Sequence, residues 1–200
     1  MNLATSLANS SRGAMRVPWL TFCLGLGAAA LFALFGPAPE AWLYDRAAIE
    51  AGELWRLVTG HMVHSDRVHL AWNLGALLLL GGLAELRLGA RALIGPLVLG
   101  VIAIDAWLWW AEPALLRYCG LSGLLNGLFV ALALGLWRQS GSRLFLLLAA
   151  GDIAKIALEA HLGGALLPTT SALWGPVPGA HLVGFGAGLA AALIPGFHSD

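Results

Sequence analysis

Long apolar runs constrain the fold of this chain more than any other feature of its sequence. Six of them are long enough, or nearly so, to cross a bilayer as helices, which takes about 20 apolar residues each. They cover residues 17–35, 70–86, 92–111, 121–137, 144–162 and 181–195. Hydrophobic residues make up 59% of the 200 residues and charged residues only 11%, whereas a soluble domain has about 25% charged residues. The sequence therefore predicts an all-α polytopic membrane protein, a bundle of six transmembrane helices.

The arginines predict how this bundle is oriented. Six of them lie before the first run, between the second and third runs, and between the fourth and fifth: Arg12, Arg16, Arg87, Arg91, Arg138 and Arg143. The connections at the other end carry acidic residues as well as arginines, and an excess of basic residues marks the cytoplasmic side. We expect a disordered cytoplasmic N-terminus over residues 1–16, a membrane domain over 17–196 and a short cytoplasmic tail over 197–200.

A hydroxyl and an imidazole each stand at the start of a glycine-rich apolar run. Ser122 lies in Gly-Leu-Ser-Gly and His181 begins the last run. Ser122 alone could be a small residue for close helix packing, but together with His181 it suggests a nucleophile and its general base. Two Gly-x-x-x-Gly pairs, which let helices approach closely, follow the two residues: Gly123 with Gly127, and Gly184 with Gly188. With no carboxylate evident as a third member, we expect a Ser–His dyad.

A second polar group precedes the run at residues 70–86. His69 and Asn73 are four residues apart and so share one face of a helix. A buried amide without partners costs a few kcal/mol, which favours a functional or interhelical role for Asn73. His69, Asn73 and the backbone N–H of Ser122 at a helix N-terminus could together bind the oxyanion of a tetrahedral intermediate.

A metal site is the competing interpretation of the histidines in this region. His61 and His64 are three residues apart and His69 follows, but the ligand set expected for zinc is incomplete, so no metal is predicted. His61 is expected to face water or lipid headgroups, and His64 to be a structural hydrogen-bonding residue.

Charged residues inside the apolar runs leave a further possibility open. Asp152, Lys155 and Glu159 are spaced three and four residues apart, on one stripe of a helix where they can pair. Charges in a membrane segment indicate function by default, and a salt-bridged stripe facing the bundle is an equally plain interpretation. Asp105 lies in the middle of its run and has no assignment. These residues would suit a small transporter.

Together the polar residues resemble the motifs of the rhomboid family of intramembrane serine proteases. The resemblance runs from about residue 55 to residue 189. The motifs that carry it are Trp55-Arg56, His64, His69-x-x-x-Asn73, Glu85-x-Arg87-x-Gly89, Gly120-x-Ser122-Gly123 and Ala180-His181-x-x-Gly184-x-x-x-Gly188. The serine and histidine motifs are weak singly, but in this order, on the fourth and sixth of six helices, they are specific.

The resemblance implies a Ser–His dyad that works without a cofactor and cleaves transmembrane substrates near the membrane surface. By position, Ser122 would be the nucleophile and His181 the base, with the oxyanion hole as above. Glu85 and Arg87 would be structural residues in the cytoplasmic turn after the second helix. Arg56 would belong to a loop that lies in the outer leaflet.

Two positions depart from the family pattern. Many rhomboids have a tyrosine four residues after the nucleophile, packed on the base, where this chain has Asn126, a possible hydrogen-bonding support of the base. Many also have a histidine directly after Trp-Arg-x-x-Thr, where this chain has Gly60. The small size, the expected absence of a soluble domain and Asn126 look more like the rhombosortase branch. Its members process bacterial surface or secreted proteins that bear a C-terminal Gly-Gly motif, an apolar helix and a basic tail.

The expected partners follow from this resemblance. They are single-pass membrane protein substrates and membrane lipid, while the formal net charge of zero argues against nucleic acid. The expected location is the bacterial inner membrane, with the active site opening to the periplasmic side. The alternative to a protease is a catalytically silent rhomboid-like protein that binds transmembrane helices.

Overall fold

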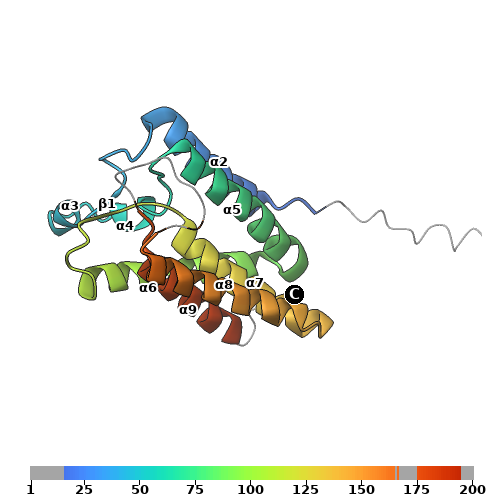
Figure 1. Cartoon of the computed structure of the whole chain (residues 1–200). Helices are drawn as coiled ribbons and strands as arrows, with labels where there is room; N and C mark the ends of the chain where they lie inside the picture. The colour runs from blue at the N-terminus through green and yellow to red at the C-terminus, as the bar shows by residue number, and fades with distance from the viewer. Residues whose placement is uncertain (1–15, 165, 167–174, 195–200) are drawn as a thin grey trace, which may run out of the picture.

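Six long helices dominate the structure, a computed structural model that describes residues 16–164, 166 and 175–194. They are α2 (Trp19–Phe35), α5 (Arg67–Leu88), α6 (Ala90–Trp110), α7 (Ser122–Ser140), α8 (Leu144–Leu162) and α9 (Pro178–Leu193) (Figure 1). Each lies in one of the six apolar runs, so the helical fold class is confirmed. By length and composition, α5 and α6 are able to cross a membrane, and α2 and α9 are shorter apolar helices. That all six cross the membrane stays a prediction.

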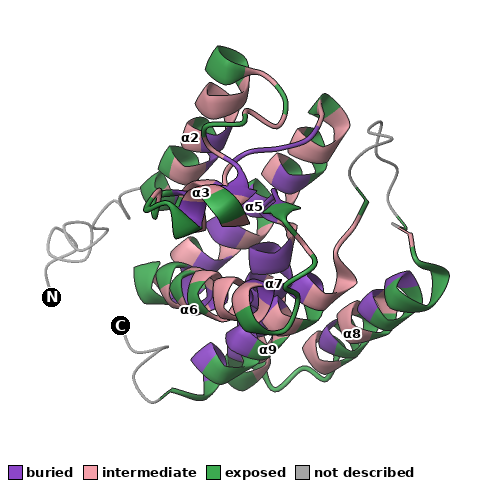
Figure 2. Cartoon of the chain, turned by 90° about the vertical axis from the view of Figure 1, so that its left-hand side faces the viewer, coloured by how far each residue is buried: buried purple, intermediate pink, exposed green. Residues whose placement is uncertain are grey.

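The bundle is built around α7. This helix contacts α5, α6, α8 and α9, and α2 packs on the outside against α5. Most of the α7 residues are buried, including Asn126 and Leu128 (Figure 2). A helix that is apolar all round is buried among other helices, and here the residues at the start of α7 are thereby enclosed on several sides.

Short elements cover the end of the bundle at which α7 begins. Between α2 and α5 lie β1 (Tyr44–Asp45), α3 (Arg46–Glu50) and α4 (Arg56–Thr59), and β2 (Arg117–Tyr118) follows α6. β1 and β2 form an antiparallel ladder in which Tyr44 faces Tyr118. The backbone N–H of Gly120 also donates to the carbonyl of Gly60 at 3.0 Å. The chain that leads into α7 is thus tied to the segment between α2 and α5.

Arg56 holds that segment together from inside. Its side chain is buried, pairs with Glu53 at 2.6 Å and donates to the carbonyls of Glu40 and Leu43. Arg56 therefore has the structural role expected of it, because one guanidinium binds two backbone oxygens of the turn at residues 40–43.

The opposite end of the bundle holds the start of α2, the end of α9 and the arginines of the two turns at 87–91 and 138–143. Glu85, near the end of α5, accepts hydrogen bonds from the backbone of Leu20 and Thr21 and so caps the start of α2. Arg138 of α7 donates to the carbonyl of Ala192 in α9. The Arg87 carbonyl accepts from the Gln139 side chain at 3.2 Å. The predicted tails at 1–16 and 197–200, apart from Arg16, lie outside the described residues.

Candidate active site

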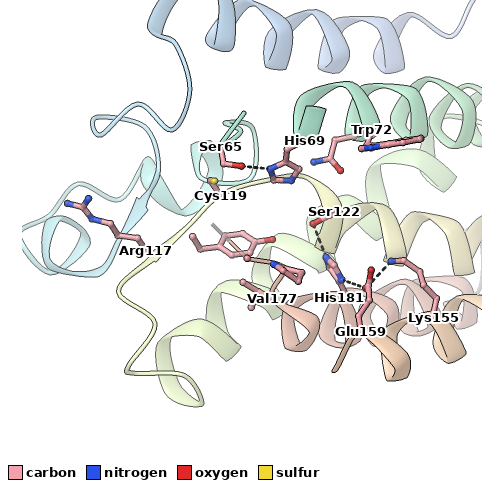
Figure 3. Close-up of a pocket in the computed structure, with 14 residues that line it drawn as sticks. Ser65, His69, Trp72, Arg117, Cys119, Ser122, Lys155, Glu159, Val177 and His181 are labelled. Carbon is pink, nitrogen blue, oxygen red and sulfur yellow. Dashed lines mark hydrogen bonds and ion pairs between the residues drawn. The ribbon is translucent and has the colours of Figure 1, made fainter. Parts of the chain in front are cut away.

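The starts of α5, α7 and α9 and the last turns of α8 surround one pocket. Its volume is about 120 Å³, and Figure 3 shows the side chains that line it. The polar ones include Ser65, His69, Asn73, Ser122, Lys155, Glu159 and His181. The structure thus brings the predicted nucleophile, base and oxyanion donors to one place.

Glycines set the distance between α7 and α9. A Cβ built at Gly184 would overlap the carbonyl oxygen of Gly123, and one built at Gly188 would overlap that of Gly127. The two backbones therefore touch directly, and only glycine fits at these positions. Ser122 and His181 each stand at the pocket end of this contact, Ser122 next to Gly123 and His181 three residues before Gly184.

Ser122, His181 and Glu159 form a hydrogen-bonded row. Ser122 Oγ lies 2.9 Å from His181 Nε2, and His181 Nδ1 lies 3.1 Å from Glu159 Oε2 (Figure 3). His181 is 7% exposed and Glu159 2%. An imidazole bonded on one nitrogen to a hydroxyl and on the other to a carboxylate is the arrangement that activates a serine nucleophile.

Glu159 was missing from the expected dyad. The sequence pointed to Glu159 only as part of a stripe with Asp152 and Lys155, and Lys155 Nζ does lie 3.2 Å from Glu159 Oε2. The bond from Glu159 to His181 joins two different helices, α8 and α9, and depends on how they pack together, so the spacing of residues within one helix could not reveal it. The expectation that no carboxylate serves His181 is wrong.

The predicted oxyanion donors line the same pocket. Asp66 caps α5 by accepting from the backbone N–H groups of Val68 and His69 at 2.9 Å each, which fixes the turn that carries His69. His69 Nδ1 lies 3.1 Å from Ser65 Oγ. Asn73 is 5% exposed, and its Nδ2 has no hydrogen-bond partner among the residues described. A buried amide donor without a hydrogen-bond partner lowers the stability of the fold. Asn73 is explained if the oxygen of a ligand accepts this hydrogen bond.

Asn126 supports the nucleophile's backbone rather than the base. Its Nδ2 donates to the carbonyl of Ser122 at 2.7 Å, one helical turn back, and no bond to His181 is recorded. Asn126 therefore does not support His181 as expected. The residue that contacts His181 Nδ1 is Glu159 of α8.

The other histidines have separate surroundings. His61 is 1% exposed and lies 3.3 Å from Asp105, so the expectation that it faces water or headgroups is wrong, and Asp105 gains a partner. His64 is fully buried and packs edge-on against His69, with the ring centroids 5.0 Å apart. Burial lowers the pKa of His64 to about 3, so its imidazole is neutral. Within the described residues no three potential ligands gather into a metal site.

Cys119, three residues before Ser122, is another nucleophilic residue at the pocket. Its side chain is buried, and burial followed by the charge of Asp66 raises the pKa of the thiol to about 12. Because the thiolate is the reactive form, Cys119 is inert at neutral pH. Ser122, with its imidazole, is the nucleophile that the geometry favours.

Comparison with known proteins places the chain in a family. The family model described as "Rhomboid domain" matches residues 51–196, which include every polar residue of the pocket. No curated protein matches the chain. Members of the matched family are integral membrane proteins and generally serine proteases that cleave within the membrane. Because one family model covers nearly three quarters of its length, the chain belongs to the Rhomboid domain family.

Proposed function

We propose that the protein is an intramembrane serine protease in which Ser122 is the nucleophile and His181 the general base. The observation that carries this proposal is the 2.9 Å contact between Ser122 Oγ and His181 Nε2 inside a polar pocket. General-base catalysis requires a heavy-atom distance of about 2.6–3.2 Å. The pocket lies where three helices begin, so the substrate bond to be cleaved would lie close to the membrane surface.

The proposed reaction begins when Ser122 Oγ attacks the scissile carbonyl carbon. His181 Nε2 accepts the hydroxyl proton as the new C–O bond forms, and the imidazolium then gives that proton to the leaving amine nitrogen as the C–N bond breaks. The product is an acyl ester on Ser122. A water, deprotonated by the same nitrogen, attacks the ester carbonyl, and the proton returns to Ser122 Oγ as the acid leaves.

The negative charge of the tetrahedral intermediate would be stabilised by donors that face Ser122. Asn73 Nδ2 is the free one, and the backbone N–H of Ser122 lies in the first helical turn, where N–H groups have no intrahelical partner. His69 would add a third donor. We expect Asn73→Ala to lower kcat by about two to three orders of magnitude, the range for one oxyanion donor, and to leave the affinity for substrate nearly unchanged.

The proposed substrates are membrane-anchored proteins of the rhombosortase type. Their signal would be a C-terminal Gly-Gly motif followed by an apolar helix and a basic tail. Glycines suit the site because they unwind a helix easily and add no side chain to a pocket of about 120 Å³. The proposed location is a bacterial inner membrane, with the arginine-rich end of the bundle in the cytoplasm and the pocket on the periplasmic side.

A fluorophosphonate probe tests the nucleophile and its base. The purified protein, in detergent or lipid, should be labelled on Ser122, and Ser122→Ala and His181→Ala should each abolish labelling and cleavage of a Gly-Gly helical substrate. Ser142→Ala, an exposed serine at the other end of α7, is the matched control and should be labelled like the wild type.

Other outcomes of these experiments would overturn the proposal. If the wild type is not labelled and also fails to cleave the helical substrate, the protein is a helix-binding member of the family. Transport through the charged stripe of α8 would instead survive Ser122→Ala, whereas proteolysis cannot. Near-normal turnover in His181→Ala would remove the proposed base.

A further inference from the structure

The carboxylate of Glu159 makes a contact that a Ser–His dyad does not need. Glu159 comes from α8, a helix that supplies neither the nucleophile nor the base, and it reaches the far nitrogen of the base, His181 Nδ1, at 3.1 Å. Figure 3 shows the row from Ser122 through His181 to Glu159 and on to Lys155. Glu159 is 2% exposed, so this contact is largely shielded from bulk solvent.

We propose that Glu159 is the positioning carboxylate of a Ser122–His181–Glu159 triad and that Lys155 holds it in place. This inference rests on the proposed function of Ser122 and His181. It adds a third element to the active site, and it gives the charged stripe of α8 a role in proteolysis instead of transport.

The hydrogen bonds around Glu159 determine which nitrogen of His181 carries the proton. The Lys155 ammonium lies 3.2 Å from Oε2, and the backbone N–H of Leu166 donates to Oε1 at 3.4 Å. A carboxylate with these donors is ionised and only accepts hydrogen bonds. His181 must then present Nδ1–H to Glu159, which leaves the lone pair of Nε2 facing Ser122 Oγ. This is the tautomer that a general base needs.

Lys155 makes the buried carboxylate tolerable. An isolated charge inside a protein or a membrane is costly, and a partner one helical turn away offsets that cost. The Lys155 side chain is 32% exposed, so its ammonium reaches the polar pocket while its stem stays on α8. Lys155 and His181 contact the same oxygen of Glu159. The positive charge of Lys155 therefore also weakens the attraction between the carboxylate and the His181 imidazolium.

A plain ion pair between Lys155 and Glu159 is the simpler interpretation, and pH separates the two. If Glu159 only stabilises α8, its loss changes the melting temperature and not the protonation of the base. If it acts on His181, removal of its charge disfavours the imidazolium, and removal of the Lys155 charge favours it. The other ionisable groups that face this site stay the same in both variants; they are Asp152 on α8, His69 on α5, and Arg117, Tyr118 and Cys119 along the pocket wall.

The test measures kcat and KM for a Gly-Gly helical substrate across pH. We expect Glu159→Gln to lower kcat by about two to four orders of magnitude with little change in KM, because the amide can donate to Nδ1 and favour the wrong tautomer. Glu159→Asp, which keeps the charge, should recover part of the loss. Glu112→Gln makes the same chemical change at an exposed site and should behave as the wild type.

The acidic limb of the profile of kcat/KM against pH gives the decisive readout. It should move to lower pH by about 1 unit in Glu159→Gln, and to higher pH in Lys155→Gln. Opposite shifts cannot arise from a loss of folding, and the Lys155 variant decides the question if the Glu159 variant does not fold. An unmoved limb in a folded, Ser122-dependent Lys155→Gln or Glu159→Gln enzyme would overturn the triad alone. Absence of Ser122-dependent turnover in the wild type would overturn the proposed function and the triad with it.

Discussion

At Gly120 the backbone lies directly against the ring of His69. Its φ is +117°, and a Cβ there would lie 2.6 Å from His69 Cε1 and 2.7 Å from His69 Nε2. No other residue type combines this backbone conformation with this close approach. The ring of His69 therefore lies between the backbone of Gly120 and the ring of His64. No bulky side chain at position 120 separates the ring from the backbone.

We predict that Gly120→Ala lowers kcat by about 100-fold or more, because the methyl group would push His69 away from the nucleophile. Substrate turnover measures the loss. Gly52→Ala is the matched control, since Gly52 has φ +104° and nothing within 4 Å of the added carbon. Gly52→Ala should lose about 1–2 kcal/mol of folding stability through backbone strain, and its kcat should be unchanged. Equal activities in the two variants would contradict the proposed place of His69.

Cys119 gives a prediction about pH. The ordinary pKa of the thiol is 9.0, and burial raises it to about 12. In a Cys23→Ser background, we expect Cys119 of the folded protein to be alkylated slowly at pH 7. The rate should still rise about tenfold per pH unit above pH 9, because the thiolate fraction grows until the pH reaches the raised pKa. Mass spectrometry of the alkylated protein measures the rate. Denatured protein is the control, and a native rate that levels off near pH 9 would show that the thiol is solvated.

At the scale of elements, the contact between α7 and α9 sets the distance between Ser122 and His181. Four glycines bring the two backbones together, and Ser122 and His181 stand one residue or one turn from this contact. The distance between Ser122 and His181 is therefore fixed by main-chain atoms, which do not repack.

We predict that Gly188→Ala destabilises the protein by about 1–3 kcal/mol, the cost of overpacking, and abolishes most activity as α9 moves away from α7. Gly186→Ala lies on the same helix, and its added carbon meets nothing within 4 Å. It should leave both properties unchanged. Thermal unfolding in detergent and substrate cleavage measure the two effects. A Gly188 variant that is as active as the Gly186 variant would refute this role for the contact.

Elements differ in how far the sequence could predict them. Each long helix was foreseen, because an apolar run of sufficient length is a local signal. The two-residue strands β1 and β2 were not, since a strand so short has no periodicity. Their pairing matters to the site, because it fixes the chain just before Ser122. Ser122 and His181 could be proposed from helix starts, whereas Glu159 could not, because its bond to His181 depends on how α8 packs beside α9.

At the scale of the whole molecule, the polar pocket and the arginines of the two turns at 87–91 and 138–143 lie at opposite ends. Ser122, His181 and His69 lie at the starts of three helices, and Arg87, Arg91, Arg138 and Arg143 lie where neighbouring helices end or begin at the other side. The family match covers residues 51–196 and does not decide which end of the bundle faces the cytoplasm. The orientation rests on the excess of arginine alone.

We predict that Glu112→Cys is labelled from outside intact cells by a membrane-impermeant maleimide, and that Ser142→Cys is labelled only after lysis. Both positions are exposed, at opposite ends of the bundle. The background replaces Cys23 and Cys119 with serine, and a gel shift of the labelled protein measures the outcome. Labelling of Ser142→Cys in intact cells, with Glu112→Cys protected, would reverse the orientation.

The sharing of one Glu159 oxygen by Lys155 and His181 has a consequence for the electrostatics of turnover. In the resting site the charges of Lys155 and Glu159 cancel, with His181 and Ser122 neutral. In the tetrahedral intermediate the imidazolium and the oxyanion add one positive and one negative charge, so these four groups sum to zero again. Charge separates over a few ångströms, but no net charge has to be created beside a lipid phase that cannot solvate it. Catalysis of this kind would be electroneutral, because the site would keep the same net charge through the whole cycle.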